Sequence, residues 1–260
     1  MNYWIKKEER AKKAQLHTQD MAERYENEIA ECVRQSVIYG GPDKQPVTDD
    51  KGTPITKFIN TDSVSAVFTE SEGKTAVLNF ASYKNPGGMF INGSSAQEES
   101  LCHESFLYNV LREFPQYYDW NNQNKNRALY KDRAIYSPNV VFERYFFQNG
   151  SKGKVKTICC DVITCAAPNK KAAQKYNYVN SIENYYVFSE RMRFVKQIAE
   201  EQGVETLILG AWGAGVFGQD AREVVKIIRA EFKSSSIKKI VLAVPGNDEN
   251  TITFKESFGG

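Results

Sequence analysis

The last hundred residues alternate between strand-like and helix-like segments, and this alternation constrains the fold more than any other feature of the chain. Short apolar runs are separated by longer segments with helical periodicity: VKTICCDVIT (155–164), ENYYVFSERMRFVKQIAEEQG (183–203), VETLILGAW (204–212), QDAREVVKIIRAEF (219–232) and IKKIVLAVPG (237–246). Strands that alternate with helices build a largely parallel sheet between helices. The run KTAVLNFAS at 74–82 is almost continuously apolar, which is typical of a strand covered on both faces. We therefore predict an α/β fold with three layers, α/β/α.

The rest of the chain adds an N-terminal helix and shorter elements. Apolar residues at steps of three and four predict one helix over residues 4–39, which Gly40-Gly41-Pro42 ends. We expect it to lie on the helical layer or to form a small cap. No repeat or linker interrupts the chain, so we expect a single domain over residues 1–260, with residues 1–40 as an N-terminal helical extension. Further expectations are β-rich runs at 55–60 and 63–70, a strand at 134–144, loops at 42–53 and 119–126, a turn at 149–154, and a helix with its apolar stripe at Leu107, Val110, Leu111 and Phe114 that ends before Pro115.

Composition and charge exclude several classes of protein. The chain has 260 residues, of which 41% are hydrophobic and 25% charged, so it can bury a core and is not disordered. Its net charge of +2 is too balanced for a protein that binds nucleic acid or a membrane surface. No run of about 18 apolar residues predicts a transmembrane helix. The N-terminus also lacks the apolar region of a secretory signal.

Cysteine and histidine content restricts the compartment and the chemistry. The five cysteines show neither the even number nor the spacing of a disulfide framework, which favours a reducing, cytoplasmic compartment. Because His17 and His103 are the only histidines, this chain alone cannot supply a three-histidine metal centre. We expect neither a metal nor another cofactor.

A glycine-rich loop, Asn85-Pro86-Gly87-Gly88-Met89, follows the apolar strand at 74–82. In an α/β sheet this places the loop at the carboxyl edge of the strands, where ligands bind. Adjacent glycines let backbone N–H groups approach an anion without interference from a Cβ atom. An ordinary strand–helix turn has the same composition, so this loop alone does not identify a site.

A second glycine-rich loop, GAWGAGVFG at 210–218, also follows a strand and precedes a helix. Residues 213–218 fit the G-x-G-x-x-G pattern of dinucleotide-binding folds. We reject a dinucleotide dehydrogenase because only 42 residues, with one strand, follow Gly218, and Lys238 stands about 20 residues further on, where that fold requires an acidic residue. A pyrophosphate shared between the two loops, with a helix N-terminus donating N–H groups, fits better. A glycine-rich turn without a ligand is the alternative.

Two adjacent glutamates, Glu98 and Glu99, follow Gln97 at the start of the next predicted helix. Ser95-Ala96-Gln97-Glu98 fits a capping box, and the helix dipole favours acidic residues in a first turn, so capping alone can explain the pair. A functional interpretation requires a carboxyl group that stays protonated near neutral pH, which burial or a nearby phosphate would favour. Successive helical residues point about 100° apart. One glutamate would therefore position a substrate while the other transfers a proton.

The segment NFASYKNPGGMFINGSSAQEESL at 79–101 resembles the signature of bacterial-type poly(ADP-ribose) glycohydrolases. That signature is three glycines, a spacer of six to eight residues and Gln-Glu-Glu. The segments DVITCAAPN (161–169) and LGAWGAGVFGQD (209–220) resemble further blocks of the family, and the similarity extends from about residue 8 to residue 244. The resemblance implies a macrodomain-like fold, in which a mixed sheet between helices binds ADP-ribose.

The resemblance also implies a role for individual residues. Glu99 would protonate the departing ribose oxygen and Glu98 would hold the distal ribose, while water attacks an oxocarbenium-like centre. The implied substrate contacts are Asn79, Asn85, Gly87, Gly88, Gln97, Gly213, Ala214, Gly215, Val216 and Phe217, with the second loop at the diphosphate. We expect a monomeric hydrolase that cleaves O-glycosidic ribose bonds of ADP-ribose adducts or polymers on modified proteins and releases ADP-ribose. It is not expected to bind nucleic acid or membranes directly.

The glycine triplet is incomplete in this chain. Depending on the alignment, Met89 stands at the third glycine or Pro86 at the first. Pro86 would remove an amide donor, and Met89 would add bulk near the ribose. Two alternatives follow: a hydrolase that prefers mono-ADP-ribose adducts or terminal units, and a module that binds ADP-ribose without cleaving it. An unrelated nucleotide enzyme or a structural protein is the third interpretation.

Other reactive or aromatic residues near these motifs have structural interpretations. Cys102 and His103 are neighbours on a helix and point apart, so we expect a half-buried cysteine and a surface histidine rather than a thiol enzyme. His103 lies four residues from Glu99 and could contact it. The remaining residues are expected in structural roles: Cys159, Cys160 and Cys165 as buried strand thiols, Trp212 and Phe217 as part core and part ligand wall, and Tyr117, Tyr118 and Trp120 as packing under the Asn-rich loop.

Overall fold

The computed structural model describes residues 3–47, 52–148 and 151–259, and within them it contains one seven-stranded sheet. Strands β5, β3, β6, β7 and β2 run parallel to one another, and β4 and β1 continue the sheet antiparallel. This confirms the mixed, largely parallel sheet. The strands, in chain order, are β1 (Val37–Gly40), β2 (Ile55–Ile59), β3 (Thr75–Phe80), β4 (Arg133–Gln148), β5 (Ser151–Cys165), β6 (Thr206–Leu209) and β7 (Lys239–Ala243), and their spatial order is β1-β4-β5-β3-β6-β7-β2.

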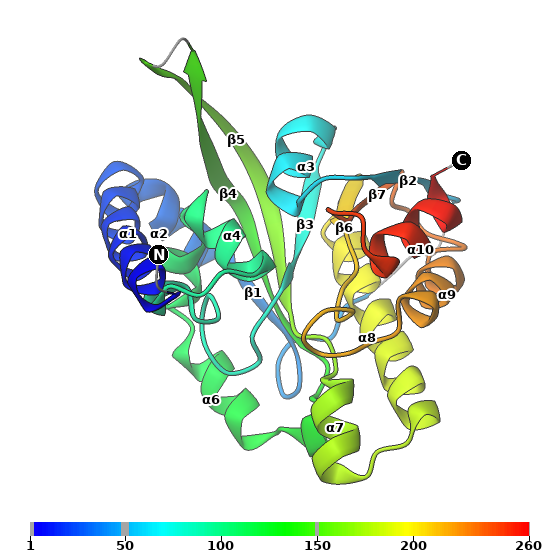
Figure 1. Ribbon diagram of the computed structural model, residues 1–260. Helices are drawn as coiled ribbons and strands as arrows, with labels where there is room; N and C mark the ends of the chain where they lie inside the picture. Colours follow the sequence, from blue (N-terminus) through cyan, green and yellow to red (C-terminus); the bar gives the residue numbers. More distant parts are fainter. Residues whose placement is uncertain (1–2, 48–51, 149–150, 260) are drawn as a thin grey trace.

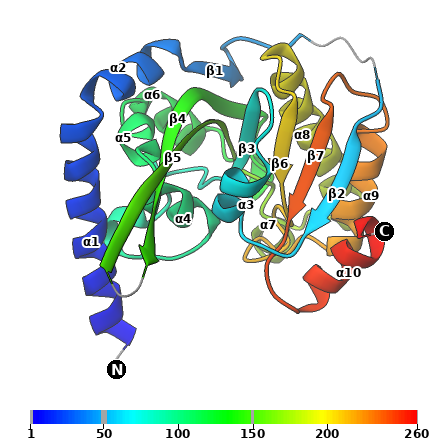
Figure 2. The same ribbon diagram turned by 90° about the horizontal axis from the view of Figure 1, so that it is seen from above.

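Helices cover both faces of this sheet (Figure 1, Figure 2). Side chains of β3 show the layering, because Ala76 and Leu78 belong to one hydrophobic core and Val77 to the other. The first core contains residues of α8 (Ser181–Glu201), α9 (Ala221–Glu231) and α10 (Glu249–Phe258). The second contains residues of α1 (Tyr3–Arg24), α2 (Glu26–Gln35), α3 (Ser63–Glu70), α4 (Gln97–His103), α5 (Leu107–Leu111) and α6 (Pro115–Gln123). The predicted three-layer fold is therefore confirmed.

The prediction of one helix over residues 4–39 is wrong at its end. The chain forms α1 and α2, which lie along one side of the molecule (Figure 2), and then strand β1. Val37, Ile38 and Tyr39 pair antiparallel with Tyr136, Ile135 and Ala134 of β4. Branched and aromatic side chains favour a strand, so this run joins the sheet although its spacing also fits a helix.

The segment at 63–70, predicted as β-rich, is helix α3. Asp62 caps it by accepting a hydrogen bond from the Ser65 amide. Val64, Val67 and Phe68 are buried on one face, at the i, i+3, i+4 spacing of a helix. The cap and this spacing outweigh the β propensity of the individual residues.

The region after the glutamate pair contains more helices than predicted. The chain breaks between α4 and α5, where Ser105 bonds to the Leu101 carbonyl and to the Leu107 amide. Pro115 lies beyond the end of α5, as predicted, and also begins α6. Residues 119–123 are therefore helical rather than part of a loop. Three further helices were not predicted: α7 (Lys170–Asn177), α10 and the 3-10 turn η2 (Asn126–Ala128).

The predicted turn at 149–154 falls partly at residues 149–150, which lie outside the described residues, and β5 begins at Ser151. The predicted loop at 42–53 includes residues 48–51, which are also outside. No helix in the described part of the chain is long and apolar enough to cross a membrane.

The sheet brings the two glycine-rich loops together. Parallel strands β3 and β6 are direct neighbours, with Ala76 opposite Leu207 and Val77 opposite Ile208. The first loop follows β3 and the second follows β6, so both leave the same carboxyl edge. A Cβ atom built on Gly210 would lie 3.0 Å from the Phe80 ring. Ligands of open α/β sheets bind at this edge.

Candidate active site

Gln97 fixes the start of α4 against the end of β3. Its Oε1 accepts a hydrogen bond from the Phe80 amide at 2.8 Å, and its Nε2 donates to the Leu78 carbonyl at 2.8 Å. The same Nε2 also lies 3.1 Å from Ser63 Oγ. Both amide atoms of Gln97 are thus used by the protein. This side chain sets the position of the two glutamates that follow it.

Glu98 is buried, with 3% of its surface exposed. Its Oε2 accepts a hydrogen bond from the Ser82 amide at 2.6 Å, and its Oε1 accepts one from Asn79 Nδ2 at 3.2 Å. Asn79 is fully buried and also contacts Thr164 Oγ1. Burial raises the pKa of Glu98 to about 8, against the lowering effect of these donors. At neutral pH the carboxyl group of Glu98 is therefore mostly protonated.

Glu99 lies against the first glycine loop. Its Oε1 accepts a hydrogen bond from the Met89 amide at 3.0 Å, and 6% of the residue is exposed. A Cβ atom built on Gly88 would lie 2.7 Å from Glu99 Oε1 and 3.0 Å from Glu98 Oε2. Both carboxyl groups therefore reach the same backbone position, although they leave the helix in different directions. Only a glycine permits this approach, and Gly88 also has a left-handed φ of 63°.

The capping box expected at Ser95-Ala96-Gln97-Glu98 does not form. The N-cap of α4 is Ala96, without a side-chain hydrogen bond, and Glu98 bonds to Asn79 and Ser82 instead. The two acidic residues are thus not explained by capping.

Met89 and Asn85 complete the first loop. Met89 has φ −118°, a conformation open to any residue, and 42% of it is exposed. The loop thus accommodates the departure from the glycine triplet. Asn85 is exposed, and its carbonyl accepts a hydrogen bond from the Gly88 amide at 3.2 Å. The effect of Met89 on substrate choice stays a prediction.

Helix α1 braces the chain just after this loop. Arg10 Nε donates to the Gly93 carbonyl at 2.7 Å, and His17 Nε2 lies 3.0 Å from the Ser105 carbonyl. The helix approaches so closely that a Cβ atom on Gly93 would lie 2.1 Å from the Lys7 carbonyl oxygen. The N-terminal extension is therefore part of the support of the site.

The second loop presents unused amides at the same edge. Within the part of the chain that the structure describes, the N–H groups of Gly215, Val216 and Phe217 have no hydrogen-bond acceptor. Val216 is 82% exposed, and a Cβ atom on Gly215 would meet nothing within 4 Å. Three consecutive free amides in an exposed turn are donors that could bind an anion.

The anion donors lie in the turn and not in the helix that follows it. Asp220 caps α9 by accepting hydrogen bonds from the Arg222 and Glu223 amides, so the helix N-terminus is already occupied. Gln219 anchors the turn: its Nε2 donates to the Pro168 carbonyl and its Oε1 accepts from Asn184. The expected contribution of the helix N-terminus is thus replaced by the turn itself.

An aromatic stack connects the two loops. The ring of Tyr83, two residues before the first loop, stacks on Tyr130 with centroids 4.1 Å apart, and Tyr130 contacts Phe217 of the second loop with centroids 6.3 Å apart. Tyr83 Oη donates to the Asn124 carbonyl and accepts from the Lys131 amide. No local pattern identifies Ser82, Tyr83 or Tyr130, because their contacts join chain segments 16 to 87 positions apart.

The residues near these motifs follow the structural interpretations with three corrections. Cys102 is fully buried rather than half-buried, and burial raises the pKa of its thiol well above the usual value, which argues against a thiolate. His103 is half-buried and contacts the Phe90 ring at 4.6 Å instead of lying on the surface. Cys159 is exposed, not buried, because it lies toward the open end of β5. Those found buried as expected are Cys160, Cys165, Trp212, Tyr117 and Tyr118, while Phe217 and Trp120 are partly buried.

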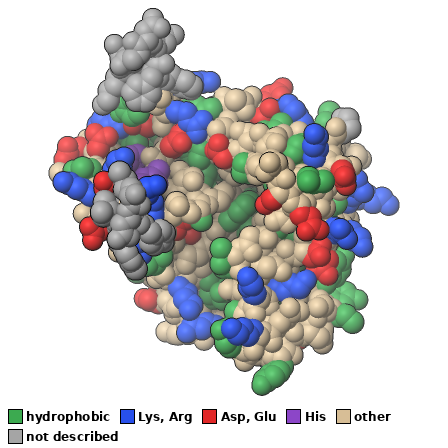
Figure 3. All heavy atoms as spheres, in the orientation of Figure 1, with side chains coloured by type: hydrophobic (Ala, Val, Ile, Leu, Met, Phe, Trp, Pro, Cys, Tyr) green, Lys and Arg blue, Asp and Glu red, His purple; other side chains and the backbone are tan. Residues whose placement is uncertain are grey.

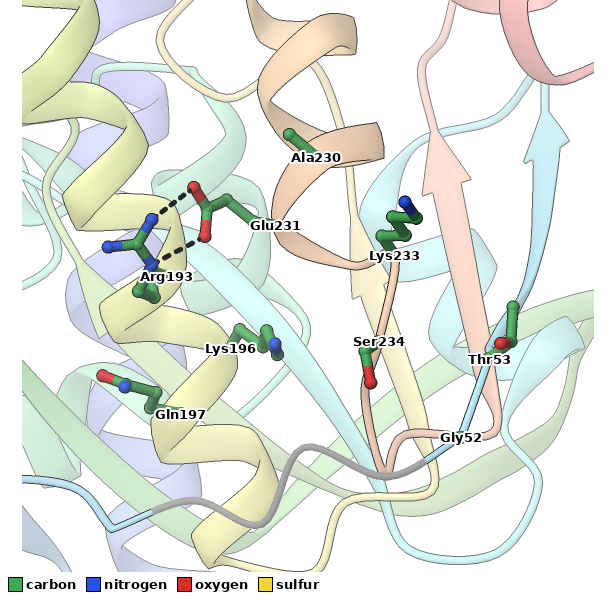
Figure 4. A pocket seen from close by; sticks show the side chains of 9 residues that line it. All are labelled: Gly52, Thr53, Arg193, Lys196, Gln197, Ala230, Glu231, Lys233 and Ser234. Atoms are coloured by element: carbon green, nitrogen blue, oxygen red, sulfur yellow. Dashed lines mark hydrogen bonds and ion pairs between the residues drawn. The ribbon is translucent and has the colours of Figure 1, made fainter.

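Two cavities of the described structure lie away from this edge. One, of about 380 Å³, lies between α8 and α9, where Arg193 and Glu231 already form an ion pair at 2.9 Å (Figure 4). The other, of about 340 Å³, borders Lys74 and Thr75 at the amino end of β3. Neither contains the glutamates or the second loop. Among the described residues, no group of three or more His, Cys, Asp or Glu is placed to hold a metal ion.

The arrangement combines a pair of buried carboxyl groups with a turn of free amides. The carboxyl groups of Glu98 and Glu99 both lie close to Gly88, which is in the loop after β3. The free amides at 215–217 are in the loop after the neighbouring strand β6. A protonated carboxyl group can pass a proton to a leaving oxygen. The free amides can hold a diphosphate while this occurs.

Comparisons with known proteins place the chain in a family. The family model "Microbial-type PARG, catalytic domain" matches residues 7–145. Poly(ADP-ribose) glycohydrolase (PARG) from Thermomonospora curvata is similar, with a TM-score of 0.82 and 26% identity over 96% of this chain and 100% of that one. The same enzyme bound to the inhibitor ADP-HPD gives 0.80 and 26% over the same shares. PARG from Deinococcus radiodurans in complex with ADP-ribose gives 0.74 and 28%, over 89% of this chain and 97% of that one. No curated protein sequence matches the chain.

Proposed function

The chain belongs to the family of microbial-type PARG catalytic domains, and from this premise we propose how its own residues carry out the hydrolysis. The enzyme is a glycohydrolase that acts on ADP-ribose polymers. We propose that it cleaves O-glycosidic ribose bonds by general acid catalysis and releases ADP-ribose from modified proteins, acting as a monomer. We also propose that residues 1–260 work as one domain, since α1 supports the first loop.

The amides of Gly215, Val216 and Phe217 bind the diphosphate in this proposal. Their N–H groups have no acceptor within the described residues, and the turn that carries them is anchored through Gln219. ADP-ribose is bound in the solved structure of the relative from Deinococcus radiodurans. The backbone of Gly87 and Gly88 would then face the distal ribose, with Asn85 at the exposed rim of the same loop.

The two glutamates share the work of the reaction. Burial keeps Glu98 mostly protonated at neutral pH, so the pair holds a proton rather than two negative charges. Glu99 shares this proton with Glu98, because the two carboxyl groups meet at Gly88, and donates it to the departing ribose oxygen as the bond from that oxygen to the anomeric carbon breaks. Water then adds to the oxocarbenium-like carbon and returns a proton to the carboxylate. Glu98 holds the distal ribose, and Asn79 and Gln97 position the pair.

One observation carries this proposal: both carboxyl groups lie within 3.0 Å of the Cβ position of Gly88, in the loop that follows β3, and the free amides follow the neighbouring strand β6. A helix cap or a surface acidic pair would not be buried against a glycine loop in this way. The proximity of acid and anion site is what a general acid reaction on an ADP-ribose unit requires.

The test compares the wild type with Glu99→Gln. General acid catalysis contributes about 10²- to 10⁴-fold, so the variant should release ADP-ribose from poly(ADP-ribose) at least about 100-fold more slowly, as measured by chromatography. Binding of ADP-ribose, measured by calorimetry, should stay within about tenfold. The control is Glu113→Gln. Glu113 is an exposed glutamate just after α5, so this variant should behave as wild type.

Two outcomes would contradict the proposal in different ways. If wild type and Glu99→Gln bind ADP-ribose equally and neither releases it from polymer, the chain is a binding module. If calorimetry detects no binding of ADP-ribose at millimolar concentration, the assignment of the site itself fails.

A further inference from the structure

The surface around the end of α7 and the start of α8 exposes an unusual number of aromatic side chains. Tyr176, Tyr178, Ile182 and Tyr186 are 68%, 94%, 69% and 65% exposed. We call these four residues, with Lys171 and Lys175, the tyrosine–lysine surface. It lies at the lower end of the molecule in the view of Figure 1, where α7 meets the start of α8.

Tyr178 has no structural reason to be a tyrosine. It is the C-cap of α7 and has a left-handed φ of 53°, a position that usually takes glycine because a side chain costs about 1–2 kcal/mol there. Its neighbour Val179 is buried and anchors the turn, but the Tyr178 ring gains no burial in return. The turn itself is held by the hydrogen bond from the Val179 amide to the Ala173 carbonyl at 3.2 Å, so the exposed Tyr178 ring is not needed for the turn and is available for a contact outside the chain.

The charge of this surface favours an anionic partner. Lys171 and Lys175 have no ion-pair partner among the described residues, and the Lys175 ammonium lies 5.1 Å from the centre of the Tyr176 ring. The acidic residues nearby are already neutralised: Glu183 pairs with Arg127 and Glu223 with Lys170. Figure 3 shows Lys and Arg side chains grouped over the same lower part of this face.

The tyrosine–lysine surface is continuous with the second glycine loop. The Lys171 amide donates a hydrogen bond to the Phe217 carbonyl at 3.0 Å, and the Lys171 side chain borders Gly218. The eight residues of α7 span roughly 12 Å at about 1.5 Å each. Tyr176 and Tyr178 therefore stand about one short helix away from the free amides at 215–217.

We propose that the tyrosine–lysine surface is a second binding site for the polymer, which takes up a part of the poly(ADP-ribose) chain that is not being cleaved. The inference rests on the proposed function and adds to it a site outside the proposed active site. Adenine bases would stack on Tyr176, Tyr178 and Tyr186, and diphosphate groups would lie near Lys171 and Lys175. Flexible polymers that alternate bases and phosphates are bound in this way by aromatic platforms between cationic side chains.

The main test is the double variant Tyr176→Ser/Tyr178→Ser. Stacking contributes about 1–3 kcal/mol per base, so KM for long polymer should rise at least about tenfold. The kcat at saturating polymer and the Kd of monomeric ADP-ribose should stay within about twofold, because the cleft is unchanged. Ile55→Ala, which removes an exposed apolar side chain on the edge strand β2, is the control and should change neither constant.

A spectroscopic test detects the contact directly. Tyr178→Trp in the Glu99→Gln background places a fluorescent ring on the surface while the polymer remains intact. Long polymer should quench its emission through stacking, whereas monomeric ADP-ribose at the concentration that saturates the cleft should not. Replacing Lys171 and Lys175 by Gln should weaken the dependence of polymer binding on salt concentration.

The outcomes separate the two proposals. An unchanged KM for long polymer, together with equal quenching by monomer and polymer, would overturn the second site and leave the proposed function intact. A rise in KM for polymer attached to a carrier protein but not for free polymer would also overturn it, since the surface would then bind the carrier. Failure of the wild type to bind ADP-ribose at all would contradict the proposed function first.

Discussion

The two glycine-rich loops have similar sequences and opposite surroundings. At the first loop, a Cβ atom on Gly87 would lie 2.7 Å from the Tyr108 ring, and one on Gly88 the same distance from Glu99. At the second loop, Gly215 has nothing within 4 Å and Val216 is 82% exposed. Glycine therefore serves two purposes here. At Gly87 and Gly88, as at Gly213 of the second loop, it lets protein groups come close, whereas at Gly215 it leaves open space.

The difference arises from the elements that cover each loop. Helix α4 presses two carboxyl groups against the first loop, and α1 holds the chain that follows it through Arg10 and Gly93. The second loop is anchored from below by Gln219 and Asn184, which leaves its outer amides free. In the proposed function, the acid that must be aligned is therefore on α4, packed against the enclosed first loop, and the anion that must enter and leave binds at the open second loop.

The largest expected effect comes from placing the same methyl group on each loop. Gly88→Ala should lower the free energy of unfolding by more than about 2 kcal/mol, because it adds left-handed strain and collides with Glu99. Displacement of Glu99 should reduce kcat about 100-fold or more. Gly215→Ala should leave the unfolding free energy within about 0.5 kcal/mol of wild type and weaken ADP-ribose binding instead. Denaturant titration measures the unfolding free energy of both variants, a turnover assay measures kcat, and calorimetry measures ADP-ribose binding. Equal changes in the two variants would contradict the difference between the loops.

The pH dependence of stability tests the buried surroundings of the first loop, because it depends on Glu98. The native pKa of Glu98, about 8, is above its usual 4.5, so the native state binds a proton that the unfolded chain releases. The contribution of Glu98 to the free energy of unfolding should therefore be largest below about pH 4.5. It should decrease as the pH rises and be lost above about pH 8, a total change of a few kcal/mol. Glu98→Gln should remove this slope, and Glu113→Gln should keep it. A wild-type slope that survives in Glu98→Gln would show that another group causes it.

A smaller effect on stability and turnover is expected at Gln97, which connects the start of α4 to the end of β3. Gln97→Ala leaves the Phe80 amide and the Leu78 carbonyl without their partner, which should cost about 1–3 kcal/mol of unfolding free energy. Because Gln97 holds the helix of the glutamates, kcat should fall while the Kd of ADP-ribose stays near the wild-type value. Gln45→Ala, at an exposed glutamine, serves as the control. A change in Kd equal to the change in kcat would place Gln97 in contact with the ligand instead.

Sequence periodicity was sufficient for the sheet and its parallel strands, because apolar runs such as 74–82 record burial on both faces. It failed where a cap or a partner strand decides the local structure. The cap that Asp62 provides stabilises α3 in a run predicted to be β-rich. Pairing with β4 stabilises β1 at the end of the predicted first helix. Neither effect is visible in the periodicity of the segment itself.

The motif of the site was readable from the sequence, but its surroundings were not. The glycine loops and the Gln-Glu-Glu run stand out as local patterns, and parallel strands explain why they meet. The aromatic stack of Tyr83 and Tyr130 and the hydrogen bond from Ser82 to Glu98 join segments that are distant in the chain. The burial that raises the pKa of Glu98 likewise depends on the whole layer of helices around α4.

The central claim is that the amides of the second loop bind the diphosphate while Glu99, which packs against the first loop, reaches the oxygen on the anomeric carbon. An experimental structure with bound ADP-ribose measures both distances at once. We expect diphosphate oxygens within about 3.2 Å of the amides at 215–217, and the carboxyl group of Glu99 within hydrogen-bonding reach of the oxygen on the anomeric carbon. A diphosphate bound elsewhere, such as in the cavity between α8 and α9, or a Glu99 carboxyl group that stays out of reach of that oxygen, would contradict the account.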